Sequence, residues 1–383
     1  MSMHKKSSVE RSIYRIQLWM EEGQYDLALT ALQRLKTHTI DQTRLIIYIS
    51  AWCHTLLEQW TEAQSVLKSL YASCSIEANW DCTKHNERER RAFCLGCLGN
   101  AALELDRFEE ASRHYTQCLK LLNERRVNLP CIRIKTLNSL GLICIVNGFY
   151  AMAINHYEEA LNLCNNMPEH DILPEIYFGL CDASRLLGRH ETAYIYGVKA
   201  FELSTQRGMQ TIESRIQHLL GKITFQRHEY DEAANHYLES LAIATQEHNQ
   251  ELKIANFTAL ADLQLAEDHL EEAKCYSQRA LELSNVMHNH YYLGQMYLTC
   301  GNVTLAESEQ TKGEQHDRLF AKARGLFEEA KESLAQTQDS ALQGEVNKRI
   351  AQMLEKSGQA QEALTYWKTA YESLTKPVGL SLD

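Results

Sequence analysis

The sequence contains little proline, with 4 prolines and 17 glycines among 383 residues. Because proline breaks helices, its scarcity favours long helical segments. No stretch of 18 or more apolar residues occurs, so no membrane-spanning helix is predicted. Residues 1–16 carry positive charge but lack the apolar region and small-residue cleavage site of a signal peptide. These absences together predict a cytoplasmic protein.

Excess basic charge and the short motifs of many enzymes are also missing. Asp and Glu number 50 against 39 Lys and Arg, a net charge of −11, which argues against a nucleic-acid partner. No GxGxxG, GxxxxGK[ST], HExxH or GxSxG string is present. We therefore expect no enzyme activity and no cofactor.

The 12 cysteines are spread through apolar segments, and without an export signal they are expected to be reduced and buried. Cys82, His85, Cys94 and Cys97 have ligand types that suit zinc. However, the eight residues between the two pairs are fewer than is usual in such sites, and Cys94 and Cys97 fall within one predicted helix. Burial is the preferred interpretation and zinc the alternative, so no metal site is predicted.

One segment recurs along nearly the whole chain, with clear copies such as LGNAALELDRFEEA (98–111) and LGKITFQRHEYDEA (220–233). Each copy ends in an alanine that follows an acidic turn, and successive alanines are separated by 35, 48, 42, 40, 40, 40, 50 and 40 residues. Such a period indicates a repeat protein. The anchoring alanines are Ala28, Ala63, Ala111, Ala153, Ala193, Ala233, Ala273, Ala323 and Ala363.

Each unit is predicted to be a pair of helices. Gly23, Gly148, Gly188 and Gly358 stand where the first helix of a unit ends, in a position that suits a positive φ. Small residues on both helices allow close approach, and aromatic residues beside them fill the remaining space. The ten extra residues before Ala323 include ESEQTKGEQHDR, so a longer loop is predicted over 307–318.

The leucine–glycine pair, the aromatic residue before the acidic turn, the anchoring alanine and the small residue seven positions later resemble the tetratricopeptide repeat. The resemblance covers about residues 10–375. Units of about 40 residues, rather than 34, look like those of kinesin light chains, Gα-binding scaffolds and bacterial peptide-pheromone receptors of the Rap type. The resemblance implies an all-α right-handed superhelical solenoid of about nine hairpins over residues 9–375, between tails at 1–8 and 376–383.

In that family the first helix of each pair lines a concave groove that holds an extended peptide or a partner's tail. The resemblance therefore implies a non-enzymatic scaffold or adaptor that binds a protein or peptide. The alternative is a regulatory sensor whose superhelix closes on a peptide, with a response-regulator phosphatase output. The residues expected on the groove side are Tyr48, Trp52, Asn100, Lys135, Asn138, Phe178, Asp182, Arg185, His218, Lys222, Gln226, Asp262 and Asn302.

Overall fold

The computed structural model is helical throughout the part of the chain that it describes and has no strand there. The described residues are 12, 15–16, 19, 24–35, 50, 54, 57, 59, 61–66, 85–105, 107–124, 129–164, 171–287, 289–337 and 340–375. They fall into two compact units, Met1–His170 and Asp171–Asp383, called here the N-terminal and C-terminal units.

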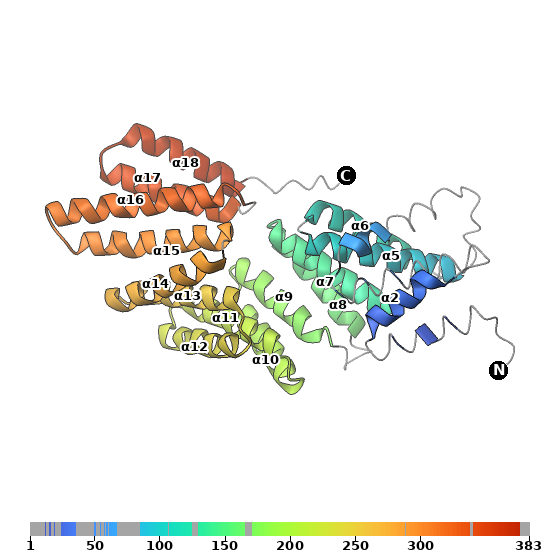
Figure 1. Cartoon of the computed structure of the whole chain (residues 1–383). Helices are drawn as coiled ribbons and strands as arrows, with labels where there is room; N and C mark the ends of the chain where they lie inside the picture. The colour runs from blue at the N-terminus through green and yellow to red at the C-terminus, as the bar shows by residue number, and fades with distance from the viewer. Residues whose placement is uncertain are drawn as a thin grey trace. The chain divides into compact units, whose positions relative to one another are not determined.

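Consecutive helices pair into hairpins within each unit (Figure 1). Described helices of the N-terminal unit are α2 (Tyr25–Arg34), α5 (His85–Glu104), α6 (Phe108–Leu122), α7 (Pro130–Val146) and α8 (Tyr150–Cys164). Those of the C-terminal unit are α9 (Leu173–Leu186), α10 (His190–Gln206), α11 (Gln210–Gln226), α12 (Tyr230–Gln246), α13 (Gln250–Ala266), α14 (Leu270–Met287), α15 (His290–Glu309), α16 (Glu314–Leu334), α17 (Ser340–Lys356) and α18 (Ala360–Thr375). The odd-numbered helices from α5 to α17 are the first helices of the hairpins, and the even-numbered helices from α6 to α18 are the second helices. The predicted all-α stack of paired helices is confirmed.

The anchoring alanines lie in the contacts between the paired helices. All nine are at most 1% exposed. The small residues seven positions later, from Cys118 to Ala370, are at most 2% exposed. Two helices pack closely only where the side chains between them are small. These positions therefore lie where neighbouring helices approach one another most closely.

A glycine on the first helix faces an aromatic ring on the second helix of the same hairpin. A Cβ atom added to Gly221 would lie 2.6 Å from two ring carbons of Tyr237, and one added to Gly99 would lie 2.5 Å from Tyr115. The Tyr237 ring is 2% exposed, so it has little room to move. The aromatic ring thus occupies the space that the absent side chain leaves.

The turn after the first helix has the same backbone conformation in successive repeats. Gly148, Gly188 and Gly358 have φ values of +78°, +74° and +74°, as the sequence predicted. His228 (+63°) and Asp268 (+60°) take the corresponding position in two other repeats. An αL residue is therefore required there even where glycine is not used.

The prediction of a longer loop over 307–318 is wrong. Helix α15 continues to Glu309 and α16 begins at Glu314, so most of the inserted residues extend the two helices. The insert is rich in Glu, Gln, Lys and Arg, which are good helix formers. Gly313, with φ +64°, sits directly before α16 and reverses the chain direction.

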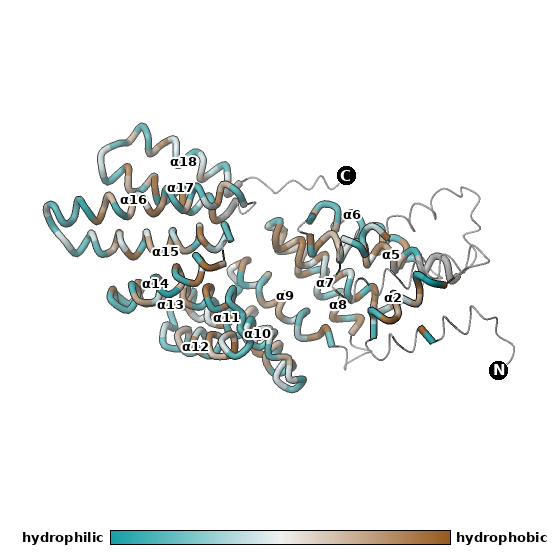
Figure 2. The backbone as a smooth tube through the Cα atoms, in the orientation of Figure 1, coloured by the Kyte–Doolittle hydropathy of each residue, from teal (hydrophilic) through white to brown (hydrophobic). Residues whose placement is uncertain are grey.

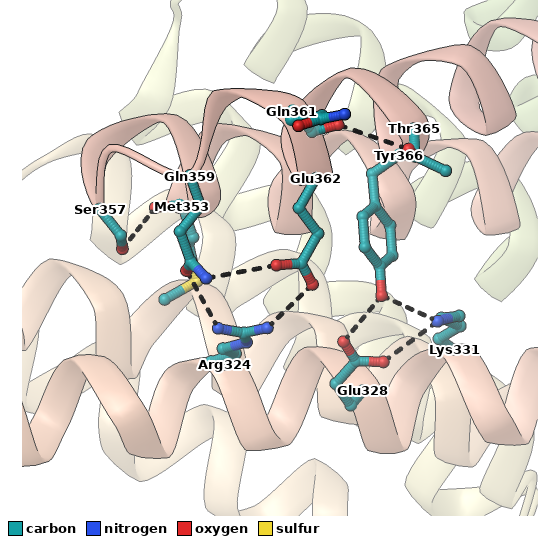
Figure 3. Close-up of polar contacts among 10 residues, drawn as sticks. All are labelled: Arg324, Glu328, Lys331, Met353, Ser357, Gln359, Gln361, Glu362, Thr365 and Tyr366. Atoms are coloured by element: carbon teal, nitrogen blue, oxygen red, sulfur yellow. Dashed lines mark hydrogen bonds and ion pairs between the residues drawn. The ribbon is translucent and has the colours of Figure 1, made fainter.

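Polar contacts connect the second helices of successive hairpins. Figure 3 shows that the guanidinium group of Arg324 on α16 contacts Glu362 on α18, with Nη2 and Oε1 3.4 Å apart. The hydroxyl of Tyr194 on α10 likewise donates to Oε1 of Glu232 on α12 over 2.8 Å. In both pairs the residue after one anchoring alanine contacts the residue before the next, so the repeat register sets these contacts as well.

Polar and apolar residues alternate along the helices (Figure 2). None of the described helices is both long and apolar enough to span a bilayer.

We expect the substitution Gly221→Ala to destabilise the protein by about 1–3 kcal/mol, because the added methyl group overlaps the Tyr237 ring. Urea denaturation followed by circular dichroism measures the change. Gly325→Ala on α16 is the matched control, because a Cβ atom there meets nothing within 4 Å. It should be neutral or stabilising by up to about 1 kcal/mol. Equal losses in both variants would contradict the proposed packing.

Candidate binding groove

The first helices lie on the inner side of the stack in the C-terminal unit. The backbones of α9 and α11, of α11 and α13, and of α13 and α15 approach one another, whereas among the described residues the backbones of successive second helices lie farther apart and are linked mainly by long side chains. Helices that approach one another more closely lie on the concave side of a curved stack. The first helices therefore provide the concave surface of this unit, as the resemblance to the tetratricopeptide repeat implied.

Three of these helices bring four predicted groove residues together. Arg185 on α9 donates to Oδ1 of Asp182 from Nε and Nη2, over 3.1 and 2.7 Å. Lys222 on α11 interacts electrostatically with this pair and with Asp262 on α13. Lys222 keeps contact with solvent. The helices around it nevertheless partly desolvate its ammonium group and, together with the charge of Arg185, lower its pKa.

A fifth predicted residue, His218, lies beneath this surface and is 8% exposed. Its Nδ1 is 2.8 Å from Oδ1 of Asn256, whose Nδ2 donates to Oγ of Ser240 over 2.8 Å. Since the amide nitrogen of Asn256 is used in this way, its oxygen accepts and Nδ1 of His218 carries the proton. Burial lowers the pKa of His218 to about 3, so the ring is neutral and acts as a structural link between helices α11, α12 and α13.

The concave surface contains a pocket of about 970 Å³. Its walls are provided by α11, α13, α15 and α17 and by the turn after α13, and no residue of a second helix lines it. We call it the C-terminal pocket. Its lining includes Phe225, Thr258, Asp262, Leu265, Asp268, Gln295, Leu298, Thr299, Asn302, Ala306, Glu309, Leu342, Glu345, Arg349, Gln352, Met353, Glu355 and Lys356.

Asp262 lines the C-terminal pocket and also lies close to the charged group formed by Asp182, Arg185 and Lys222. Burial raises the pKa of Asp262 to about 7, although Arg349 and Lys222 both act to lower it. No ion pair within 4.0 Å is found for this carboxylate among the described residues. Its negative charge is therefore only partly compensated by the protein.

The other predicted groove residues have varied surroundings. Asn100 accepts a hydrogen bond from the hydroxyl of Tyr115 over 2.6 Å, and Lys135 on α7 is exposed. Phe178 packs against the apolar side chains between α9 and α11, beneath the guanidinium group of Arg215 at 4.8 Å. Asn138 is half-buried, and Gln226 is exposed on α11. Tyr48 and Trp52 lie outside the described residues.

The prediction missed the contribution of α17, although the repeat register contains the signal. Gln352 stands eleven positions before Ala363, as Asp262 does before Ala273. Lys356 stands seven positions before Ala363, as Gln226 does before Ala233. Both residues line the C-terminal pocket. Extending the register to the last repeat would have found them.

Two of the cysteines considered for zinc are buried on one helix. Cys94 and Cys97 are 3% and 8% exposed on α5, and burial raises the pKa of the Cys97 thiol. Cys82 lies outside the described residues. No group of three or more metal-ligating side chains converges within the described ranges.

The raised pKa of Asp262 has a consequence for stability. Folding favours the neutral acid, so this residue costs stability as the pH rises from about 4 through 7. We expect Asp262→Asn to stabilise the protein more at pH 8 than at pH 4. The difference should be about 1 kcal/mol, less than the full shift would give, because the side chain keeps some solvent contact. Urea denaturation at the two pH values measures it.

Glu372→Gln, an exposed carboxylate on α18, is the control and should show the same effect at both pH values. A stabilisation by Asp262→Asn that does not depend on pH would contradict this account.

Comparison with known proteins agrees with the helical-hairpin architecture. A family model of the tetratricopeptide repeat matches residues 213–285. Outer dynein arm-docking complex subunit 4 of Homo sapiens is 26% identical over 178 residues, which are 46% of this chain and 26% of that protein. The chain therefore spans about a quarter of the length of the curated relatives that it matches.

Two solved structures share the fold over most of the chain. A Rap protein complexed with Competence and Sporulation Factor has a TM-score of 0.65 at 12% identity, covering 96% of this chain and 98% of that one. Aspartyl phosphate phosphatase F from Bacillus subtilis has a TM-score of 0.59 at 12% identity, covering 100% and 98%. The repeat match over residues 213–285 and the helical hairpins around it show a protein of the tetratricopeptide-repeat type, and its fold resembles that of the Rap protein.

Proposed function

We propose that the protein is a non-enzymatic interaction module that holds a segment of a protein or peptide partner against the first helices of its C-terminal unit. The observation that carries this proposal is the C-terminal pocket, which opens on the concave surface and is lined by four successive first helices. A pocket of about 970 Å³ is at the upper end of the range for ligand sites. It has room for several residues of a bound segment.

The polar lining of the pocket suits an extended backbone. Gln295, Asn302 and Gln352 each carry an amide that both donates and accepts hydrogen bonds, as a peptide bond does. Phe225, Leu298 and Met353 add apolar surface on which side chains can pack. Amides for the backbone and apolar patches for side chains together support peptide binding.

A peptide-responsive sensor is a second candidate. It is favoured by the likeness to the Rap protein that was crystallised with Competence and Sporulation Factor. In a sensor, the bound segment shifts the hairpins to a second arrangement, and the output depends on that shift. Small-angle scattering with and without a bound peptide separates the candidates, because a scaffold keeps its radius of gyration and a closing superhelix reduces it.

Selection of a phage-displayed random peptide library on the full-length chain tests the proposal. The selected peptides should lose at least tenfold in affinity for the double variant Asn302→Ala/Gln352→Ala, because two of the pocket's amides are removed. Fluorescence anisotropy of labelled peptides measures the dissociation constants.

The matched control is Asn235→Ala/Gln361→Ala, which removes one Asn and one Gln amide from exposed positions on second helices. It should bind the peptides like the wild type. Equal binding by both double variants would place the binding surface elsewhere and reject the proposal.

A further inference from the structure

The C-terminal pocket has an unbalanced charge. Five carboxylates and two basic side chains line it, a formal charge of −3. The carboxylates are Asp262, Asp268, Glu309, Glu345 and Glu355, and the basic side chains are Arg349 and Lys356.

Some of this charge is compensated within the pocket walls. Nζ of Lys356 is 2.5 Å from Oε1 of Glu309, and Nε of Arg349 is 3.1 Å from Oε1 of Glu345. Asp262 and Asp268 have no ion pair within 4.0 Å among the described residues. Both basic side chains are thus already engaged. Three of the five carboxylates remain without an ion pair within the described ranges, since Glu355 only accepts a hydrogen bond at Oε1 from Nε1 of Trp367 over 2.9 Å.

The backbone adds to the negative potential at one end of the pocket. Alternate helices of a hairpin stack run in the same direction, so the C-terminal ends of α13, α15 and α17 lie together, as the Lys356–Glu309 contact between α17 and α15 confirms. Helix C-termini carry partial negative charge. The last turns of α13 and α15 contain no basic residue that would offset it. Asp268, Glu309 and Glu355 stand at this same end.

The pocket also contains a hydrogen-bond acceptor that lacks a donor. Oδ1 of Asn302 is buried and has no hydrogen-bond partner among the residues that the structure describes. A buried acceptor without a donor is costly, and a ligand that supplies a donor removes that cost. Lysine and arginine side chains are donors only, with several N–H groups each.

We propose that the C-terminal pocket binds a positively charged side chain, lysine or arginine, of the partner segment. This inference rests on the proposed function and names the chemistry that the groove selects. A divalent cation is the weaker alternative, because no three ligating side chains converge in the described part of the chain. The pocket volume also exceeds what a single ion requires. An acidic segment would meet uncompensated like charge.

The experiment uses the same random library, selected on the full-length chain. Peptides selected on the wild type should be enriched in lysine or arginine at one position. Each enriched peptide is then synthesised with that residue replaced by a neutral analogue of similar size, citrulline for arginine or norleucine for lysine. Fluorescence anisotropy should show an affinity loss of at least tenfold for the neutral peptide on the wild type.

The double variant Asp262→Asn/Asp268→Asn tests the assignment to this pocket. It keeps the size and hydrogen-bonding capacity of both side chains, and circular dichroism checks that it folds. On this variant the charged and neutral peptides should differ by less than twofold. The control Glu202→Gln/Glu372→Gln removes two exposed carboxylates from second helices and should retain the full preference.

The results distinguish failure of the charge preference from failure of peptide binding in the groove. Peptides that depend on Asn302 and Gln352 but show no preference for positive charge overturn this inference and leave the groove function standing. A charge preference that the control variant also loses overturns the assignment to the pocket. A library that yields no groove-dependent peptide overturns both proposals.

Discussion

The close contact between the two helices of each hairpin is the constraint on which the rest of the structure depends. Where Gly221 faces the ring of Tyr237, no side chain can be added without displacing the ring. The same contact recurs at Gly99, Gly141 and Gly301, the last against Phe327. The described hairpins whose first helix carries Cys181, Ala261 or Ala351 at this position also have a small side chain there, and it is buried in each. Because the two helices of a hairpin approach at the same place in successive repeats, the hairpins stack with their first helices on one side. The concave surface is therefore a consequence of packing, not of any single groove residue.

The residues that pack the helices together are different from the residues that line the groove. The groove residues are therefore free to vary in chemistry. The anchoring alanines and the glycine–aromatic contacts are fully buried and hold the helices in position. Residues eleven positions before each anchor, such as Asp262 and Gln352, lie on the first helix and face the concave side. They are held by a rigid framework to which they contribute little. A rigid framework reduces the ordering cost of binding, since little of the site has to be immobilised when a segment enters.

Much of the fold was predictable from the sequence because the packing constraint repeats. A forty-residue register of buried alanines specifies paired helices without reference to any other protein. The register also located Asp182, Arg185, Lys222 and Asp262, which the structure brings together across three helices. The inserted residues before Ala323 were misjudged, because a polar composition was taken as a loop where Glu, Gln and Lys continue two helices. Local polarity does not distinguish a solvent-exposed helix from a loop.

The site was only partly predictable because burial and charge depend on neighbours far apart in sequence. His218 was expected on the groove side, yet it is buried, as is Thr258 at the same register position of the next repeat, and its Nδ1 is hydrogen-bonded to Asn256 on the next first helix. The pocket itself arises where α15 and α17 face one another, and their residues are about fifty positions apart. The raised pKa of Asp262 likewise reflects packing around it and not its sequence context.

Photo-cross-linking of a selected peptide is the most direct test of the central claim that the first helices hold the partner. A peptide with a photoreactive residue at its centre is bound to the full-length chain, irradiated, and its attachment points are mapped by mass spectrometry. The account predicts attachment to α11, α13, α15 and α17, at residues such as Gln295 and Gln352. Attachment to the second helices α12, α14, α16 and α18 would contradict it.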